Sequence, residues 1–312
     1  MSPELTGRLT GFRRGKRGKC RFGSREACKG EPAVSFGNAE RPRRVVLKAG
    51  FLPAIGGSHS TMNIASRPGR LGTPCLACPL RLKPAFRDKT DDEIRFIQTM
   101  KTDHRTVRTG QDIIHPGQED AELYTLFSGW AFRYKSLPDG RRQILNFLLP
   151  GDLVGLQASL LSAAEHGIEA LTDVELCVFP RKRLWDLFVR MPTLAYEVSW
   201  LGSREECMVD DNLTSVGQRS AGERLAALII SLYHRADALG LVTNDGFDFP
   251  LAQQQLADAL GLSLVHTSKT WSRLRREGLF SFAGGRLVLL NPHLTARMAA
   301  AYERITAPRP LI

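Results

Sequence analysis

The apolar and polar positions of the C-terminal third follow a helical period on both sides of one glycine. In the stretch Leu251–Leu279, this pattern predicts two short helices joined at Gly261, the residue type that best adopts the left-handed conformation ending a helix. In the second helix, Thr267, Trp271 and Leu274 recur at i, i+4 and i+7. These three side chains are therefore expected to face the core.

The opposite face of the second helix is polar, and Ser263 is placed to cap its first turn. The residues expected to contact DNA are Ser263, Val265, His266, Ser268, Lys269, Ser272, Arg273 and Arg276. A glycine-joined helix pair of this kind indicates a helix-turn-helix, whose second helix reaches base edges in the major groove. Residues 278–290 then predict two strands around an Ala-Gly-Gly turn, a wing near the phosphates. An ordinary helical hairpin is the alternative, but the cap, the glycine and the polar face all fall in register for a helix-turn-helix.

The middle of the chain has the shorter period of strands. Four strand-like segments alternate with turn residues between positions 110 and 180, at 122–127, 130–135, 143–149 and 174–179. This spacing predicts an antiparallel barrel or sandwich. Residues 192–215 return to a helical period, with Leu194, Val198, Leu201 and Met208 near one face. We expect this long helix to pair with its copy in a homodimer, the alternative being packing on its own barrel.

The amino-acid composition adds information mainly about the N-terminal part of the chain, which is strongly basic. Residues 1–74 hold 15 Lys and Arg against 4 Asp and Glu, which accounts for the whole net charge of +11. This stretch predicts a disordered basic tail that adds salt-dependent phosphate contacts. A second interpretation of residues 1–61, a mis-assigned start upstream of Met62, stays open. The remaining body is neutral, so specific DNA affinity has to come from local clusters.

The cellular setting follows from what the sequence lacks. The chain has no export signal and no run near the ~18 apolar residues of a membrane span. We therefore expect a cytoplasmic protein with no membrane partner, in a reducing compartment where its six cysteines serve as metal ligands or redox sensors more often than in disulfides.

Taken together, these segments resemble the Crp/Fnr superfamily of bacterial transcription regulators, in particular its Fnr/FixK-like branch. The resemblance covers about residues 75–290 and is carried by the barrel run at 123–155, the ERLAALI segment at 223–229 and the helix-turn-helix. It implies an α+β fold with a cyclic-nucleotide-binding-like jelly-roll barrel (75–191), a dimerisation helix (192–220), a winged helix-turn-helix (221–291) and a C-terminal tail (292–312). It further implies a homodimer that binds palindromic promoter DNA, with RNA polymerase as a partner.

One departure from the family concerns its cyclic-AMP-binding members. These carry a Glu after a glycine and then an Arg-Ser pair, whereas the chain has Leu156 after Gly155, and His166-Gly167 at the pair. A leucine cannot bond a ribose hydroxyl, and no arginine is present to pair with the cyclic phosphate. The sequence therefore argues against cyclic AMP and leaves the effector unknown. His166 is expected to be a surface residue.

A second departure concerns cysteine. In the oxygen-sensing branch, four cysteines hold an iron–sulfur cluster, three before the barrel and one in a late strand. Cys75 and Cys78 match the first two and Cys177 matches the late one, whereas Pro84 stands at the position of the third. An iron–sulfur cluster with a non-cysteine ligand, a different metal, a thiol switch and a structural pair without cofactor all stay open. Cys20 and Cys28 are further candidates to join the pair, although their spacing is unusual. Cys207, in the long helix, is expected to be a packing residue.

A third departure lies in the predicted reading helix. Family members place Glu-x-x-[Ser/Gly]-Arg where this chain has Val265-His266-Thr267-Ser268-Lys269. The missing glutamate removes an acceptor for cytosine N4, while valine fits a thymine methyl and lysine donates to guanine as a point charge. We therefore expect a DNA site different from the usual family half-site.

Two other classes of function compete with this interpretation. An effector-binding module without DNA activity would share the barrel, but the helix-turn-helix and wing argue against it. An enzyme would need a nucleophile–base set, a phosphate loop or a histidine-rich metal motif, and none stands out in the sequence. The sequence thus favours a DNA-binding transcription regulator that is not an enzyme and that senses an effector or redox signal through its barrel.

Overall fold

The computed structural model of the chain describes residues 72–161, 163–299 and 308–312. The predictions made for residues 1–71 therefore lie outside the described residues. These are the basic tail, the alternative start at Met62, and the two cysteines Cys20 and Cys28. The described residues all belong to one compact unit of the chain.

The described chain begins with short helical turns and one capped helix. The 3₁₀ turns η1 (Cys75–Ala77) and η2 (Pro79–Leu82) lead to helix α1 (Asp91–Met100). Thr90 caps α1: its hydroxyl accepts the backbone N–H of Glu93, whose carboxylate accepts the backbone N–H of Thr90. This capping box fixes where the helix starts, and α1 then buries its apolar stripe against the barrel core.

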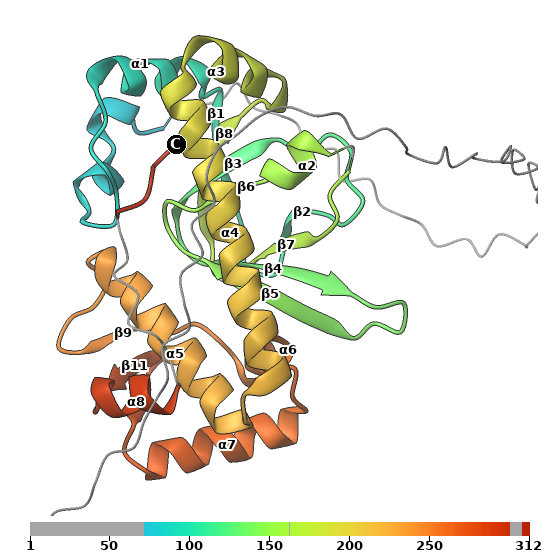
Figure 1. The fold of residues 1–312 in the computed structure, drawn as a ribbon, viewed down its shortest axis with the longest axis vertical. Helices are drawn as coiled ribbons and strands as arrows, with labels where there is room; N and C mark the ends of the chain where they lie inside the picture. Colours follow the sequence, from blue (N-terminus) through green and yellow to red (C-terminus); the bar gives the residue numbers. More distant parts are fainter. Residues whose placement is uncertain (1–71, 162, 300–307) are drawn as a thin grey trace, which may run out of the picture. The chain divides into compact units, whose positions relative to one another are not determined.

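Eight strands form two four-stranded antiparallel sheets (Figure 1). One sheet has the order β1-β8-β3-β6 and the other β2-β7-β4-β5. Their bounds are β1 Asp103–Val107, β2 Asp112–Ile114, β3 Leu123–Ser128, β4 Ala131–Ser136, β5 Arg142–Leu148, β6 Leu153–Val154, β7 Gly167–Ala170 and β8 Val174–Phe179. Apolar side chains of both sheets meet in a shared core. The expected jelly-roll barrel is therefore confirmed.

The four predicted strands correspond to β3, β4, β5 and β8, each within one residue at either end. β1, β2, β6 and β7 were not predicted individually. They are two to five residues long, and a period of two cannot be recognised in so few positions.

One short helix lies within the run of barrel strands, and two helices come after it. α2 (Leu156–Leu160) sits between β6 and β7, α3 (Leu184–Arg190) follows β8, and α4 (Pro192–Gln218) is the expected long helix, three residues longer than predicted. Leu194, Val198 and Leu201 are buried on one face of α4, as expected, whereas Met208 is only half-buried. Cys207, expected to be a packing residue of this helix, is exposed in the single chain, so packing against a second copy stays a prediction.

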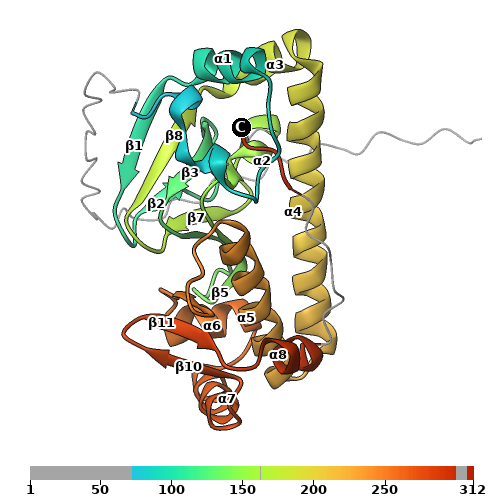
Figure 2. The same cartoon turned by 90° about the vertical axis from the view of Figure 1, so that its left-hand side faces the viewer.

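The C-terminal third holds the helix-turn-helix and its wing (Figure 2). Helix α5 (Ala221–Ala238) precedes strand β9 (Gly246–Asp248), helices α6 (Gln253–Leu260) and α7 (Leu264–Arg276), and the hairpin β10 (Phe280–Ala283) and β11 (Arg286–Leu289). β9 adds a third strand to the predicted wing, in the order β10-β11-β9. Gly261 has φ 63° and ends α6 in the left-handed conformation, as predicted.

The stretch expected as a C-terminal tail contains further structure. Helix α8 (Pro292–Met298) packs against α5, and residues 308–312 lie against the barrel. Among the described residues, no helix has both the length and the apolar character needed to cross a membrane.

Candidate functional site

Helix α7 is positioned by its cap and by the core behind it. The Ser263 hydroxyl accepts the backbone N–H of His266 at 3.3 Å and starts the helix. Thr267, Trp271 and Leu274 are buried, as predicted. The Trp271 ring meets that of Phe280 of the wing at 4.6 Å between centroids, so α7 and β10 are fixed against each other.

The other face of α7 is open to solvent. All eight residues expected to contact DNA are exposed: Ser263, Val265, His266, Ser268, Lys269, Ser272, Arg273 and Arg276. Three arginines lie in the last turn, where they also favour the helix dipole. Of these, Arg273 pairs with Glu277 at 3.2 Å. The N-terminal half of the helix thus carries one lysine among polar and apolar side chains suited to base edges, and its last turn carries three arginines suited to phosphates.

The barrel interior contains polar groups that have no partner within the described chain. Arg133 of β4 lies opposite Asn146 of β5 in the sheet register. Both side-chain amide atoms of Asn146 and the Nε of Arg133 are buried without a hydrogen bond, while another guanidinium nitrogen of Arg133 pairs with Glu205 of α4. Buried polar groups are nearly always bonded, so this cluster has spare donors and acceptors for a bound molecule.

His166 borders the same cluster, and its predicted surface position is wrong. The residue directly precedes β7 and is only 8% exposed. Burial, with Arg133 and Lys135 nearby, lowers the pKa of His166 to about 4. The imidazole is therefore neutral at pH 7 and able to accept as well as donate a hydrogen bond.

The three candidate metal ligands are brought into one neighbourhood beside Lys101. Burial, together with the other two cysteines, raises the pKa of Cys75 to about 11 against the lowering effect of Lys101. Burial also raises the pKa of Cys177. Metal ligation needs thiolates, and among the described residues no group of three His, Cys, Asp or Glu is placed to hold a metal ion. The metal-ligand role expected of Cys75, Cys78 and Cys177 stays a prediction.

A polar contact joins the barrel to the helix-turn-helix. The guanidinium of Arg142 on β5 donates to Glu169 of β7 at 2.8 Å and to Asp258 of α6 at 3.1 Å. The neighbouring Gln143 donates to the carbonyl oxygen of Ala259 at 3.1 Å. Through these bonds α6, the helix that precedes α7, is held by the barrel.

A second contact is centred on Asp152, in the turn before β6. The carboxylate is 2% exposed and pairs with Arg235 of α5 at 2.6 Å, with Arg204 of α4 at 3.8 Å and with Arg309. Burial alone would raise the pKa of Asp152, but the three guanidinium groups outweigh it and hold that pKa below its usual range. Sequence reasoning missed this residue and Arg142, because each partner lies far away in the chain.

Two family models match the chain in these regions. The cyclic nucleotide-binding domain matches residues 104–191, and the Crp-like helix-turn-helix domain matches residues 223–294. The first range contains the barrel, and the second contains α5 to the wing.

Curated relatives and solved structures match over a longer range. The nitrogen fixation regulation protein FixK of Bradyrhizobium diazoefficiens is 31% identical over 229 residues, covering 73% of this chain and 94% of FixK. The transcriptional activator protein FnrL of Cereibacter sphaeroides is 28% identical, covering 69% of this chain and 87% of FnrL. The structure of FixK2 from Bradyrhizobium japonicum superposes with a TM-score of 0.59 at 26% identity, covering 64% of this chain and 98% of that one.

Proposed function

Because this chain belongs to the Crp/Fnr family of transcription regulators, we propose that it binds a palindromic promoter site as a homodimer under the control of an effector sensed by its barrel. The exposed polar face of α7, backed by a rigid core, is the observation that carries the proposal. We further propose that it works in the cytoplasm with RNA polymerase as a partner and without enzymatic activity. A barrel module without DNA activity is disfavoured because the helix-turn-helix is complete.

In the proposed complex, the first half of α7 enters the major groove. Val265 would contact a thymine methyl, while His266 and Lys269 would bond base edges, with Lys269 on guanine O6 or N7. Arg273 and Arg276, one to two turns further along, would contact phosphates and set the register. Because the family's glutamate is replaced by Val265, the half-site should differ from that of relatives that keep the glutamate.

The test is selection from random duplex DNA with the full chain. We expect enrichment of a two-fold symmetric sequence whose half-site centres lie about one helical turn, roughly 34–36 Å, apart. Enrichment of a single asymmetric site would overturn the proposal that the protein binds DNA as a two-fold symmetric dimer. Retention of no sequence at low salt would overturn DNA binding itself.

Replacing Lys269 with alanine should weaken binding to the selected site by about 1–3 kcal/mol, because it removes a base contact. Lys182→Ala is the matched control, since it removes the same charge from an exposed position in the 3₁₀ turn after β8. Fluorescence anisotropy on selected and scrambled duplexes measures the difference. If both variants lose affinity equally on both duplexes, Lys269 acts only through net charge and its base-reading role is refuted.

The homodimer is supported by apolar side chains of α4 that no described part of the chain covers. Leu213 is 71% exposed there. In a two-fold dimer each copy would bury it once, so Leu213→Glu should raise the dimer dissociation constant on the order of 100-fold. Sedimentation velocity over a dilution series measures this constant. Leu137→Glu, an exposed leucine in the β4–β5 turn, is the control, and equal behaviour of the two variants would count against α4 as the interface.

For the effector, we propose a small polar molecule carrying acceptor groups, bound beside Arg133, Asn146 and His166. Arg133 supplies a cation, Asn146 both a donor and an acceptor, and neutral His166 either role. Because Arg133 also pairs with Glu205 of α4, occupancy would be transmitted to that helix. Cyclic AMP is disfavoured by Leu156, which packs with the apolar core next to α4.

The depressed pKa of His166 predicts a pH dependence of stability. An unfolded histidine titrates near 6.5, whereas in the folded chain the pKa of His166 is about 4, so only the unfolded state takes up a proton between these values. The free energy of unfolding should therefore fall by about 2 kcal/mol from pH 7 to pH 5 on account of this group. Urea titrations at both pH values on the parent and on His166→Gln measure this share. An equal fall in both proteins would contradict it.

A further inference from the structure

Residues 308–312 lie on the sensor domain as an added extended segment (Figure 1). The Arg309 backbone N–H donates to the carbonyl oxygen of Ala85 at 2.8 Å, and the Arg87 N–H donates to the carbonyl oxygen of Arg309 at 3.0 Å. The Arg87 side chain donates in addition to the carbonyl oxygen of Pro308 at 2.8 Å. The pairing is parallel, and it is the way in which an extended peptide binds a free backbone edge.

The side chain of Arg309 fills a polar socket next to this edge. It is 6% exposed, and its guanidinium donates to the carbonyl oxygens of Pro150 at 2.9 Å and Gly151 at 3.1 Å and pairs with Asp152. The Phe86 ring stacks on it at 4.8 Å. A buried guanidinium is tolerated only where it is paired and hydrogen-bonded, so this socket is shaped for a planar cation.

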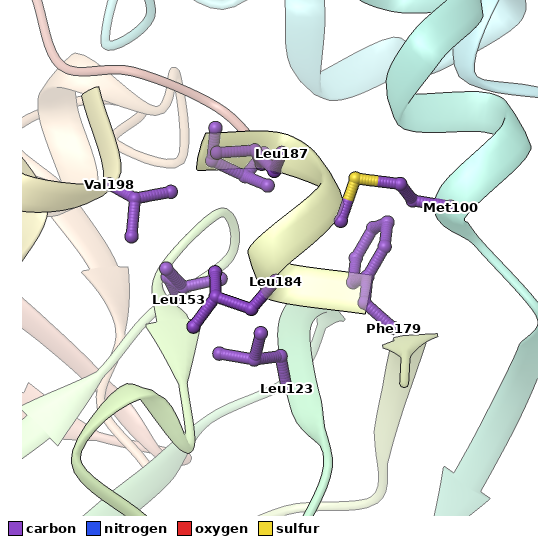
Figure 3. A pocket seen from close by; sticks show the side chains of 8 residues that line it. Met100, Leu123, Leu153, Phe179, Leu184, Leu187 and Val198 are labelled. Atoms are coloured by element: carbon purple, nitrogen blue, oxygen red, sulfur yellow. The ribbon is translucent and has the colours of Figure 1, made fainter. Parts of the chain in front are cut away.

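Two apolar side chains of the segment are buried beyond the socket. Leu311 lies over Gly151, at a position where a Cβ on that glycine would come within 3.3 Å of it. Ile312 closes a small apolar pocket whose wall includes Met100, Leu123, Phe179 and Val198 (Figure 3). The Thr125 hydroxyl donates to the carbonyl oxygen of Ile312 at 2.5 Å. Along its five residues, the segment thus meets a backbone edge, then a socket for a cation, and then an apolar pocket.

We propose that the sensor domain carries a peptide-binding site and that residues 308–312 are its built-in ligand. The site takes an extended segment with an arginine at the second position and apolar residues at the fourth and fifth. Because the segment follows the helix-turn-helix domain and α8 in the chain, its docking ties that domain to the barrel. The socket carboxylate Asp152 also holds Arg204 of α4 and Arg235 of α5, so release of the segment alters a contact shared by both helices.

Because residues 308–312 belong to the same chain as their site, even a weak intrinsic affinity of the segment for the site keeps the site occupied. A tethered segment experiences an effective concentration in the millimolar range, so a dissociation constant of about 0.1 mM for the free peptide would keep the site mostly filled. The same segment added in solution should therefore bind only when the chain's own copy is removed. This inference goes beyond the proposed function, since neither DNA nor an effector enters it.

The test uses the full chain without residues 308–312 and a labelled peptide of sequence Pro-Arg-Pro-Leu-Ile. We expect saturable binding of the peptide to the shortened chain, at least tenfold tighter than to the complete chain, by fluorescence anisotropy. A peptide with alanine in place of arginine should bind at least tenfold more weakly. Changing the peptide rather than Asp152 leaves the protein's folding untouched.

Three outcomes would overturn the proposal: no binding to the folded shortened chain up to about 1 mM peptide, equal binding to both chains, or equal binding of the alanine peptide. Hydrogen exchange on the complete chain gives a readout that needs no variant. Docking predicts that the amides of Arg87 and Arg309 exchange at least tenfold more slowly than in an unstructured peptide. Exchange of both at the unstructured rate would equally refute the site.

Discussion

Replacing Asp152 with alanine is expected to lower the free energy of unfolding by about 3–5 kcal/mol, because it leaves buried guanidinium groups without their counter-charge. The carboxylate pairs with Arg204, Arg235 and Arg309, and its Oδ2 also accepts the backbone N–H of Leu149 at 2.7 Å. Removing one anion therefore affects α4, α5, the 308–312 segment and the turn before β6 at once. The loss should exceed that from any exposed ion pair of the chain.

Urea denaturation followed by circular dichroism at pH 7 measures the loss. Asp139→Ala is the matched control: this aspartate lies in the β4–β5 turn, where it bonds Arg141 at the surface, and its removal should cost under about 0.5 kcal/mol. A loss below about 1 kcal/mol for the Asp152 variant would show that its arginines find other partners.

The ion pairs of Asp152 also have a defined pH window. Since the pKa of Asp152 is held below its usual range in the folded chain, its contribution to stability is complete above the unfolded pKa of about 3.9. It is lost as the pH falls through the lower, folded pKa. The difference in stability between parent and Asp152→Ala should therefore stay constant at neutral pH and shrink only in acid.

Local patterns predicted the elements that local interactions determine. The cap at Ser263, the left-handed Gly261 and the buried row Thr267, Trp271 and Leu274 all depend on residues at most seven positions apart, and all were identified. The longer strands were identified for the same reason. The residues predicted to lie on the polar face opposite this buried row are exposed. Their contacts with DNA stay a prediction.

The remaining features depend on pairs that are distant in the sequence. Arg142 meets Asp258 across 116 residues, and Arg309 meets Asp152 across 157. The periodic pattern of apolar residues carries no information about pairs so far apart in the sequence. For this reason, neither the contact between the barrel and α6 nor the docked 308–312 segment was predicted. His166 was misplaced because its burial in the folded chain cannot be read from the polar residues beside it in the sequence.

Trp271→Ala is expected to cost about 3–5 kcal/mol of stability in the helix-turn-helix domain, because it leaves a large cavity in an aromatic core. The ring is 6% exposed and lies 5.8 Å from Phe249, 4.6 Å from Phe280 and 5.5 Å from Phe282, between ring centroids. These partners belong to the wing and to the segment before α6. The tryptophan therefore sets the position of α7 relative to the wing as well as the stability of the domain.

For that reason the variant should lose DNA affinity even where it stays folded. We expect at least a tenfold weaker binding of the selected site at a temperature where circular dichroism shows native helix content, since α7 can then rock on its core. Trp185→Ala is the matched control, because this tryptophan of α3 is 74% exposed and its loss should change stability by under about 0.5 kcal/mol. Full DNA affinity in a folded but destabilised Trp271→Ala protein would show that the cap and turn alone orient α7. The aromatic core would then serve stability without positioning the face that reads DNA.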